Sequence, residues 1–364
     1  MEMESQVNVQ HDLLDRETRR KKILRRSFLF FNCALLGVGT TAAPLLVRLY
    51  FVRGGTRIWL STWLQTAGFP IVFLSILLSY FYRRKNSPEG SKAKPYFLTW
   101  GLFIASVIIG VLGGVGNYLY AFGAGKLPVS TSTLLLSTQL VFVAGFAFII
   151  VKQKVTSYTS NSVVLLTVAS LILGLQANGD RPNHESNKTY YTGFFMTLGS
   201  AAVVGIYLPL IELTYMKANQ NVTYYLVMEM QLVISIFANA FSTVGMLVNK
   251  DFQAIPKEAR EYEIGEAKYY LVLVMNAVLW QFYFLGAAGV VFSASSLFSG
   301  IVMAVCLPIT EVLAVLFFHE DFKAEKGVAL ALSIWGFISY FYGEFKQSKQ
   351  ENPALNPEHD DSTT

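Results

Sequence analysis

The sequence has few charges, few cysteines and few histidines for its length. Charged residues make up 15% of the 364 residues, whereas soluble proteins carry roughly 25%. Hydrophobic residues reach 53% and occur in long uninterrupted blocks, which argues against a soluble globular domain. The two cysteines, Cys33 and Cys306, lie far apart in sequence and inside apolar blocks, so a disulfide framework is excluded.

The motifs of soluble catalysis are missing as well. The four histidines fall in predicted tails or loops, so we expect no His-centred metal site or catalytic triad in the membrane, and no cofactor. There is no Walker A sequence, so ATP does not drive the protein directly. The net charge of +5 comes with basic residues in short loops beside apolar blocks. Such residues are topology signals, and we expect no nucleic-acid partner.

What is present is a series of apolar blocks, each long enough to cross the hydrocarbon of a bilayer as a helix. They lack the alternation of barrel strands, so the sequence predicts an all-α integral membrane protein of about ten transmembrane helices. The predicted spans are Ser27–Val47, Ile58–Tyr82, Phe97–Leu119, Val129–Val151, Asn161–Gln176, Tyr191–Tyr215, Thr223–Val248, Tyr269–Val290, Ser295–Phe318 and Gly327–Gly343.

Loop charges predict the orientation. The segment 1–26 and the loop between the second and third spans are rich in Lys and Arg, which places both in the cytosol. An even number of spans returns the polar tail, 345–364, to the cytosol, and its composition predicts disorder. The sequon at Asn187 then falls outside, where it can be glycosylated. The first apolar block is long enough to act as a signal anchor.

The chain also resembles itself. The segment Asn117–Gly123 matches Trp280–Gly286 at an offset of 163 residues (283 − 120), with Tyr120 on Tyr283 and Gly123 on Gly286. The predicted ten-helix domain, 27–344, therefore divides into two five-helix repeats, about 27–178 and 191–344. Because five is odd, the second repeat is inverted, and inverted repeats place a substrate site between the two halves.

Carboxyl groups inside predicted spans are the sharpest chemical signal, because a charge in hydrocarbon is costly. Glu311 lies near the middle of the ninth span, three residues after Pro308, which we expect to break that helix. Glu311 and Glu229 are candidate proton-coupling groups, with a structural carboxyl as the alternative. Glu212, near a span end, is expected to be interfacial. No Lys or Arg lies deep in a span, which argues against anionic substrates.

Aromatic residues reach 14% of the chain, and several lie beside amides at plausible membrane depth. Planar faces with amide donors and acceptors suit a flat, nitrogen-rich heterocycle, although each residue alone can equally join helices. The candidate substrate-binding residues are Trp63, Gln65, Asn117, Tyr118, Gln139, Asn276, Trp280 and Gln281.

Specific stretches resemble the plant purine permeases, within the drug/metabolite transporter superfamily. They include Leu127–Leu134, Val244–Phe252, Leu307–Val315, Ala324–Gly327 and Trp335–Phe337. The similarity covers nearly the whole chain except both tails, and Leu307–Val315 contains Glu311.

The resemblance implies ten helices in an inverted five-plus-five arrangement and proton-coupled uptake of adenine, cytokinins or related purines. The plasma membrane is the expected location of such a carrier. Other carriers of this fold take alkaloids, pyridoxine or caffeine-like compounds, so these substrates stay open, as does the oligomeric state. From a different class, a polytopic membrane enzyme would need a polar constellation at a bilayer surface, for which His319-Glu320-Asp321 is the only hint.

Overall fold

The computed structural model of the chain describes residues 2–86, 96–127, 132, 135–136, 138–153, 156–175, 187–318 and 324–351. These residues form α-helices, one π-helix and connecting turns, with no β-strand among them. A helix satisfies its backbone hydrogen bonds within one segment, so the described part of the chain has the secondary structure that its apolar blocks predict.

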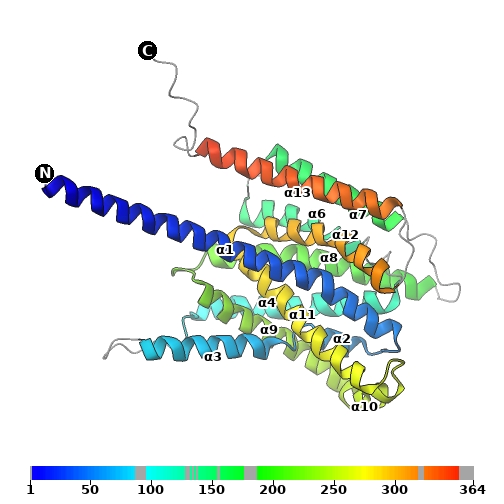
Figure 1. The fold of residues 1–364 in the computed structure, drawn as a ribbon. Coiled ribbons are helices and arrows are strands. Elements are labelled where there is room, and N and C mark those ends of the chain that lie inside the picture. The colour runs from blue at the N-terminus through cyan, green and yellow to red at the C-terminus, as the bar shows by residue number, and fades with distance from the viewer. Residues whose placement is uncertain are drawn as a thin grey trace.

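Most helices lie side by side, and α1 extends beyond the others at the N-terminus (Figure 1). Their bounds, in chain order, are α1 (Glu2–Val52), α2 (Ile58–Leu64), α3 (Phe69–Asn86), α4 (Trp100–Lys126), α6 (Gln139–Phe146), the π-helix η1 (Ala147–Val151), α7 (Ser157–Leu175), α8 (Asn187–Met216), α9 (Tyr224–Val248), α10 (Asp251–Glu261), α11 (Glu266–Ser293), α12 (Ser296–Phe318) and α13 (Ala324–Glu351).

Seven helical stretches among the described residues are long and apolar enough to cross a membrane. They are Ile23–Val52, Ile58–Lys85, Trp100–Lys126, Tyr191–Met216, Tyr224–Val248, Glu266–Ser293 and Ser296–Ala314. Two shorter apolar helices, Gln139–Val151 and Gly327–Gly343, cover parts of the predicted fourth and tenth spans. The membrane class is confirmed, and the count of ten spans stays a prediction.

The outward faces of these helices are apolar. Phe30 is 77% exposed, Trp100 is 74% exposed and Val248 is 77% exposed. Contiguous apolar surface of this kind aggregates in water, whereas in a bilayer it lies against acyl chains.

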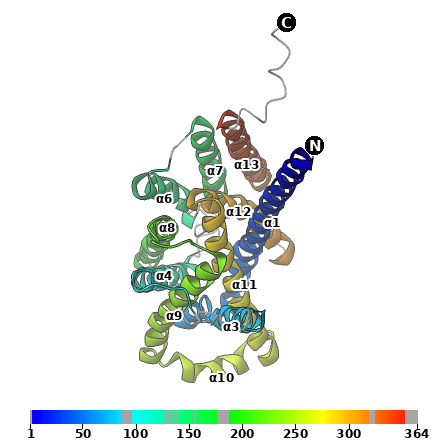
Figure 2. The same cartoon turned by 90° about the vertical axis from the view of Figure 1, so that its left-hand side faces the viewer.

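Two pairs of long helices form the centre of the molecule: α1 packs along α11, and α4 packs along α8. Two further helices, α7 and α13, pack on each other at one edge of the bundle, opposite α10 (Figure 2). The central pairs cross closely at glycines. A Cβ on Gly286 of α11 would lie 2.7 Å from Leu36 Cα, and one on Gly123 of α4 would lie 3.1 Å from Thr197 Cβ.

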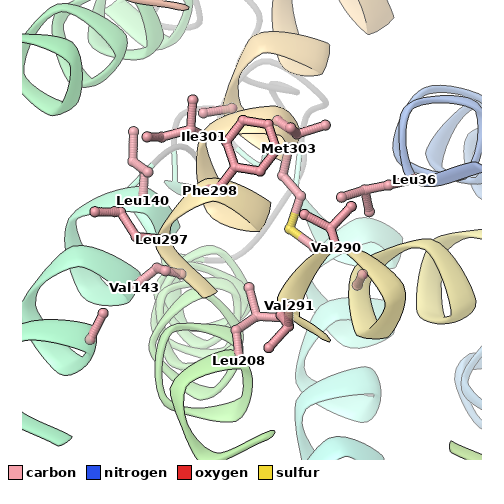
Figure 3. Packing of buried hydrophobic residues seen from close by; sticks show 14 of the residues in the cluster. Leu36, Leu140, Val143, Leu208, Val290, Val291, Leu297, Phe298, Ile301 and Met303 are labelled. Atoms are coloured by element: carbon pink, nitrogen blue, oxygen red, sulfur yellow. The ribbon is translucent and has the colours of Figure 1, made fainter. Parts of the chain in front are cut away.

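The largest buried cluster surrounds α12. Its residue Ile301 is fully buried, and the same cluster contains Leu36 of α1, Leu140 of α6, Leu208 of α8 and Val290 of α11 (Figure 3). The helix α12 therefore lies in the interior, in contact with both central pairs.

The second predicted span is one stretch in sequence but two helices in the structure. Gln65 to Gly68 form a turn between α2 and α3. A Cβ on Gly68 would lie 2.9 Å from Gln281 Cβ, so a glycine lets α11 approach the turn. Asn239 of α9 donates to the Trp63 carbonyl oxygen and to Thr66 Oγ1, both at 3.2 Å. The break is thus a packed feature, with Trp63 and Thr66 hydrogen-bonded to α9.

The amphipathic helix α10 covers one end of the bundle through a buried polar network. Glu258 accepts hydrogen bonds from the hydroxyls of Tyr50 (2.5 Å) and Tyr269 (3.1 Å), and Asp251 pairs with Arg57 at 3.3 Å. Burial raises the pKa of Asp251 above its usual value, and the Arg57 guanidinium opposes that rise. The network ties α10 to α1 and α11, beside an apolar cluster that includes Ala259 and Ile255 of α10.

Two boundary predictions need correction. The helix α12 is continuous across Pro308, where we expected a break, because neighbouring helices support the backbone of a proline-containing membrane helix. The tail predicted to be disordered is helical as far as Glu351, the end of α13. Residues 352–364 lie outside the described part of the chain.

Candidate substrate site

A central cavity has walls from both halves of the chain. Its residues come from α1, from Gln65 in the turn after α2, from α4, from Leu136, and from α6, α8, α11 and α12. Three of these helices present residues at i, i+3, i+4 and i+7, the spacing of one helical face. The residues are Gly113, Gly116, Asn117 and Tyr120 of α4; Ser200, Val203, Val204 and Tyr207 of α8; and Gly300, Met303, Ala304 and Leu307 of α12.

The cavity encloses about 910 Å³ of space between atoms, counting the part open to solvent. Its wall is mainly apolar and aromatic, with a few amides and hydroxyls and no ionisable acid or base other than tyrosine among the described lining residues. Such a wall suits a planar, uncharged molecule with polar atoms on its edge.

Four of the eight predicted substrate-binding residues line this cavity: Gln65, Asn117, Gln139 and Trp280. Gln65 Nε2 donates to the Asn117 carbonyl oxygen at 3.2 Å, which joins the α2–α3 turn to α4. The Asn117 side-chain nitrogen and the Trp280 ring nitrogen are buried without a hydrogen-bond partner among the described residues. Buried donors without partners are uncommon in native proteins, so these two atoms are available to a ligand.

Aromatic rings surround Trp280. Its ring lies edge-to-face with Tyr120 (centroids 5.4 Å apart, 71°) and with Tyr283 (5.2 Å, 73°). All three residues line the cavity, which gives it a rigid aromatic side next to the amides of Asn117 and Gln139.

The other four predicted residues lie elsewhere. Trp63 donates its ring N–H to Thr243 Oγ1 at 3.0 Å, and Tyr118 stacks on Trp59 with centroids 4.2 Å apart. Asn276 and Gln281 are fully buried in α11, and neither is among the described cavity-lining residues. Residues adjacent in a helix point about 100° apart, so Tyr118 and Gln281 turn away although Asn117 and Trp280 face the cavity.

Sequence reasoning missed Tyr120, Tyr207, Tyr283 and Met303 as cavity residues. A signal for two of them was present. Tyr120 and Tyr283 each follow a predicted site residue by three positions, and such a spacing keeps both on one helical face.

Pairs of residues in the cavity wall also show the 163-residue offset of the internal repeat. Five pairs of lining residues are separated by 163 positions: Thr40 with Val203, Pro44 with Tyr207, Asn117 with Trp280, Tyr120 with Tyr283, and Leu140 with Met303. The two central helix pairs are related by the same offset. A shift of 163 positions carries the apolar part of α1 onto α8 and carries α4 onto α11. The packing of α1 on α11 therefore corresponds to the packing of α8 on α4.

The candidate carboxyl groups occupy different places. Glu311 follows the lining residues Ala304 and Leu307 by seven and four positions, so its backbone lies on the same face of α12. Its side chain is outside the described part of the structure. Pro308 has no N–H, which leaves the carbonyl group of Ala304 without its helical donor.

Glu229 and Glu212 contact helix starts. Both carboxylate oxygens of Glu229, which is 6% exposed, accept the Phe97 N–H just before α4, at 3.1 and 2.9 Å. Glu212 accepts the N–H of Ser296, the first residue of α12, at 2.7 Å. A negative group is favourable there because it meets unpaired N–H groups. Neither residue is among the described residues that line the cavity.

Comparison with known proteins decides the family. A family model described as purine nucleobase transmembrane transport (PUNUT) matches residues 27–350. The chain belongs to the purine permease family. This permease is 50% identical over 326 residues to purine permease 3 of Arabidopsis thaliana, across 90% of the present chain and 93% of that protein. It is 45% identical over 338 residues to purine permease 2 of the same plant, across 90% and 94%.

The fold of the permease also occurs in a solved structure. A crystal structure superimposes with a TM-score of 0.59 over 86% of this chain and 97% of that one, at 14% sequence identity. At so low an identity the likeness concerns the fold alone.

The family assignment settles the broad class: the protein is a membrane transporter and not an enzyme. The alternative of a polytopic membrane enzyme is therefore set aside. The described residues also contain no group of histidine, cysteine or acidic side chains arranged to hold a metal ion. His319-Glu320-Asp321 lies outside the described residues.

Proposed function

We propose that this purine permease takes up adenine, cytokinins and related purines together with protons, and that the central cavity is the substrate site. The observation that carries the proposal is the cavity wall, where aromatic rings and amide groups from both halves of the chain meet. Trp280, Tyr120 and Tyr283 offer ring faces, and Asn117 and Gln139 offer hydrogen-bonding groups for a heterocycle edge.

The two halves supply a route for alternating access. With inverted five-helix repeats, rocking one half against the other exposes a central site to each side of the membrane in turn. The five lining pairs at the repeat offset and the matching central helix pairs support this arrangement. The ten-span count follows from the same proposal, with the two shorter apolar helices and α7 added to the seven longer stretches as spans.

Proton coupling is assigned to Glu311, with Glu229 as the second candidate. Glu311 lies by register on the cavity face of α12, one turn after Leu307. A carboxyl group at that position can take a proton from the outer side and lose it to the less acidic cytosol. The hydrogen bonds of Glu229 to the chain before α4 favour a structural role for that residue.

Orientation follows from the basic loops. The N- and C-terminal segments lie in the cytosol, and Asn187 and α10 lie outside. The plasma membrane is the location that suits uptake. Carriage of another small heterocycle, such as an alkaloid, pyridoxine or a caffeine-like compound, is the alternative, because the same aromatic and amide wall accepts those rings.

The test is uptake of labelled adenine into cells at outer pH 5 and pH 8. We expect faster uptake at pH 5 because the inward proton gradient adds to the driving force, and loss of that difference with a protonophore. Glu311→Gln should abolish the stimulation by acid, whereas Glu229→Gln should keep it.

Three outcomes contradict parts of the proposal. Acid-stimulated uptake that survives in Glu311→Gln and fails in Glu229→Gln moves the coupling to Glu229. Uptake of adenine that is equal at both pH values removes proton coupling. A well-expressed protein at the cell surface that takes up pyridoxine or an alkaloid but no adenine overturns the substrate.

A further inference from the structure

Met303 contacts two hydrogen-bond donors inside the cavity. Gln139 Nε2 donates to the Met303 sulfur at 3.2 Å, and the Tyr283 hydroxyl donates to the same sulfur at 3.7 Å. These donors come from α6 and α11, and the sulfur comes from α12. Met303 is only 4% exposed and lies in the buried cluster near Leu36 and Val290 (Figure 3). The three side chains therefore meet at one point of the cavity wall.

A thioether is a weak acceptor. It satisfies a buried amide or hydroxyl partly, so each donor can leave the sulfur for a nitrogen or oxygen acceptor at little cost. The buried ring N–H of Trp280, whose ring lies 5.2 Å from that of Tyr283, has no partner among the described residues. This part of the wall thus presents donors that are unpaired or weakly held.

We propose that Met303 sets the range of substrates that the permease accepts. In the empty cavity its sulfur holds the Gln139 and Tyr283 donors, and a ring nitrogen of the substrate replaces the sulfur as their acceptor. When a ligand has no acceptor at that edge, the donors stay on the sulfur and are not left unpaired. The thioether therefore lowers the penalty for an imperfect ligand, which broadens specificity. This inference rests on the proposed function, since it takes a purine-like heterocycle as the ligand.

Two substitutions of Met303 have opposite expected effects. Leu is close to Met in volume but has no acceptor, so in Met303→Leu the donors have no partner except the ligand. Binding of adenine is then kept or tightened, while an analogue that lacks the facing nitrogen leaves a donor unpaired. In Met303→Gln a strong amide acceptor competes with the ligand for the same donors, so the KM for adenine rises.

The experiment measures KM and maximal uptake for adenine and for its 1-deaza, 3-deaza and 7-deaza analogues, each of which replaces one ring nitrogen by carbon. For at least one analogue, we expect the ratio of its KM to the KM for adenine to be about tenfold larger in Met303→Leu than in the wild type. A tenfold change is the usual effect of one unpaired buried donor. Met303→Gln should raise the KM for adenine with little change in maximal uptake. Met246→Leu, a fully buried methionine outside the cavity, is the matched control and should behave as the wild type.

Other results overturn the inference in distinguishable ways. If the wild type transports adenine but Met303→Leu discriminates among the analogues no more than the wild type does, the thioether does not set specificity, and the proposed function stands. The same holds if Met303→Gln leaves the KM for adenine unchanged. If surface-localised wild type transports no adenine, the proposed function fails and this inference fails with it.

Discussion

Gly286→Ala is expected to unfold or strongly destabilise the permease, although it adds a single methyl group. The new Cβ would lie 2.7 Å from Leu36 Cα and 2.9 Å from the Asn32 carbonyl oxygen. Both are backbone atoms of α1, so no side-chain rotation relieves the overlap and the two helices must separate. Overpacking costs about 1–3 kcal/mol in ordinary cores, and we expect about 3 kcal/mol or more here because the whole crossing shifts.

The measurement is the thermal unfolding of purified protein in detergent, alongside Gly101→Ala. A Cβ on Gly101 meets no atom within 4 Å, and alanine is a better helix former than glycine, so this control should melt at the wild-type temperature or higher. If the two variants melt at the same temperature, the close crossing of α1 and α11 is wrong.

Ala304→Phe should abolish uptake of purines while leaving the permease folded. Ala304 is 4% exposed and lines the cavity on α12, between Met303 and Leu307 on one helical face. A phenyl ring at that position extends into the space that the proposed site requires for the substrate. Uptake of labelled adenine should fall to the level of cells without the protein.

Its control is Ile309→Phe, which adds a ring on the same helix at a residue that is 40% exposed and does not line the cavity. Both variants should reach the cell surface in wild-type amounts, and only Ala304→Phe should lose uptake. Normal uptake by well-folded Ala304→Phe would mean that purines follow another route.

The sequence was sufficient for the class of fold, because long apolar blocks have one common solution in a bilayer. The sequence was insufficient to predict which face of each helix points into the protein interior and which points to lipid. In a soluble helix the polar side marks the surface, but a membrane helix meets apolar groups both in lipid and in the protein interior. Tyr118 and Tyr120 are therefore alike in sequence, although one stacks on Trp59 and the other lines the cavity.

The internal repeat was the stronger guide to the site. It pointed to the segments around Asn117 and Trp280, and both residues line the cavity. Met303 had no such signal, because a methionine in an apolar helix is most often core packing and its role depends on donors from α6 and α11. The turn at Gln65–Gly68 had a local signal, Gly68-Phe69-Pro70, since glycine followed closely by proline favours a break.

An experimental structure of the permease with adenine bound tests the assignment of the substrate site most directly. We predict density for the purine in the central cavity, against the rings of Trp280 and Tyr283 and within hydrogen-bonding distance of Asn117 or Gln139. Density for adenine at another place, with this cavity empty, would contradict the assignment of the site.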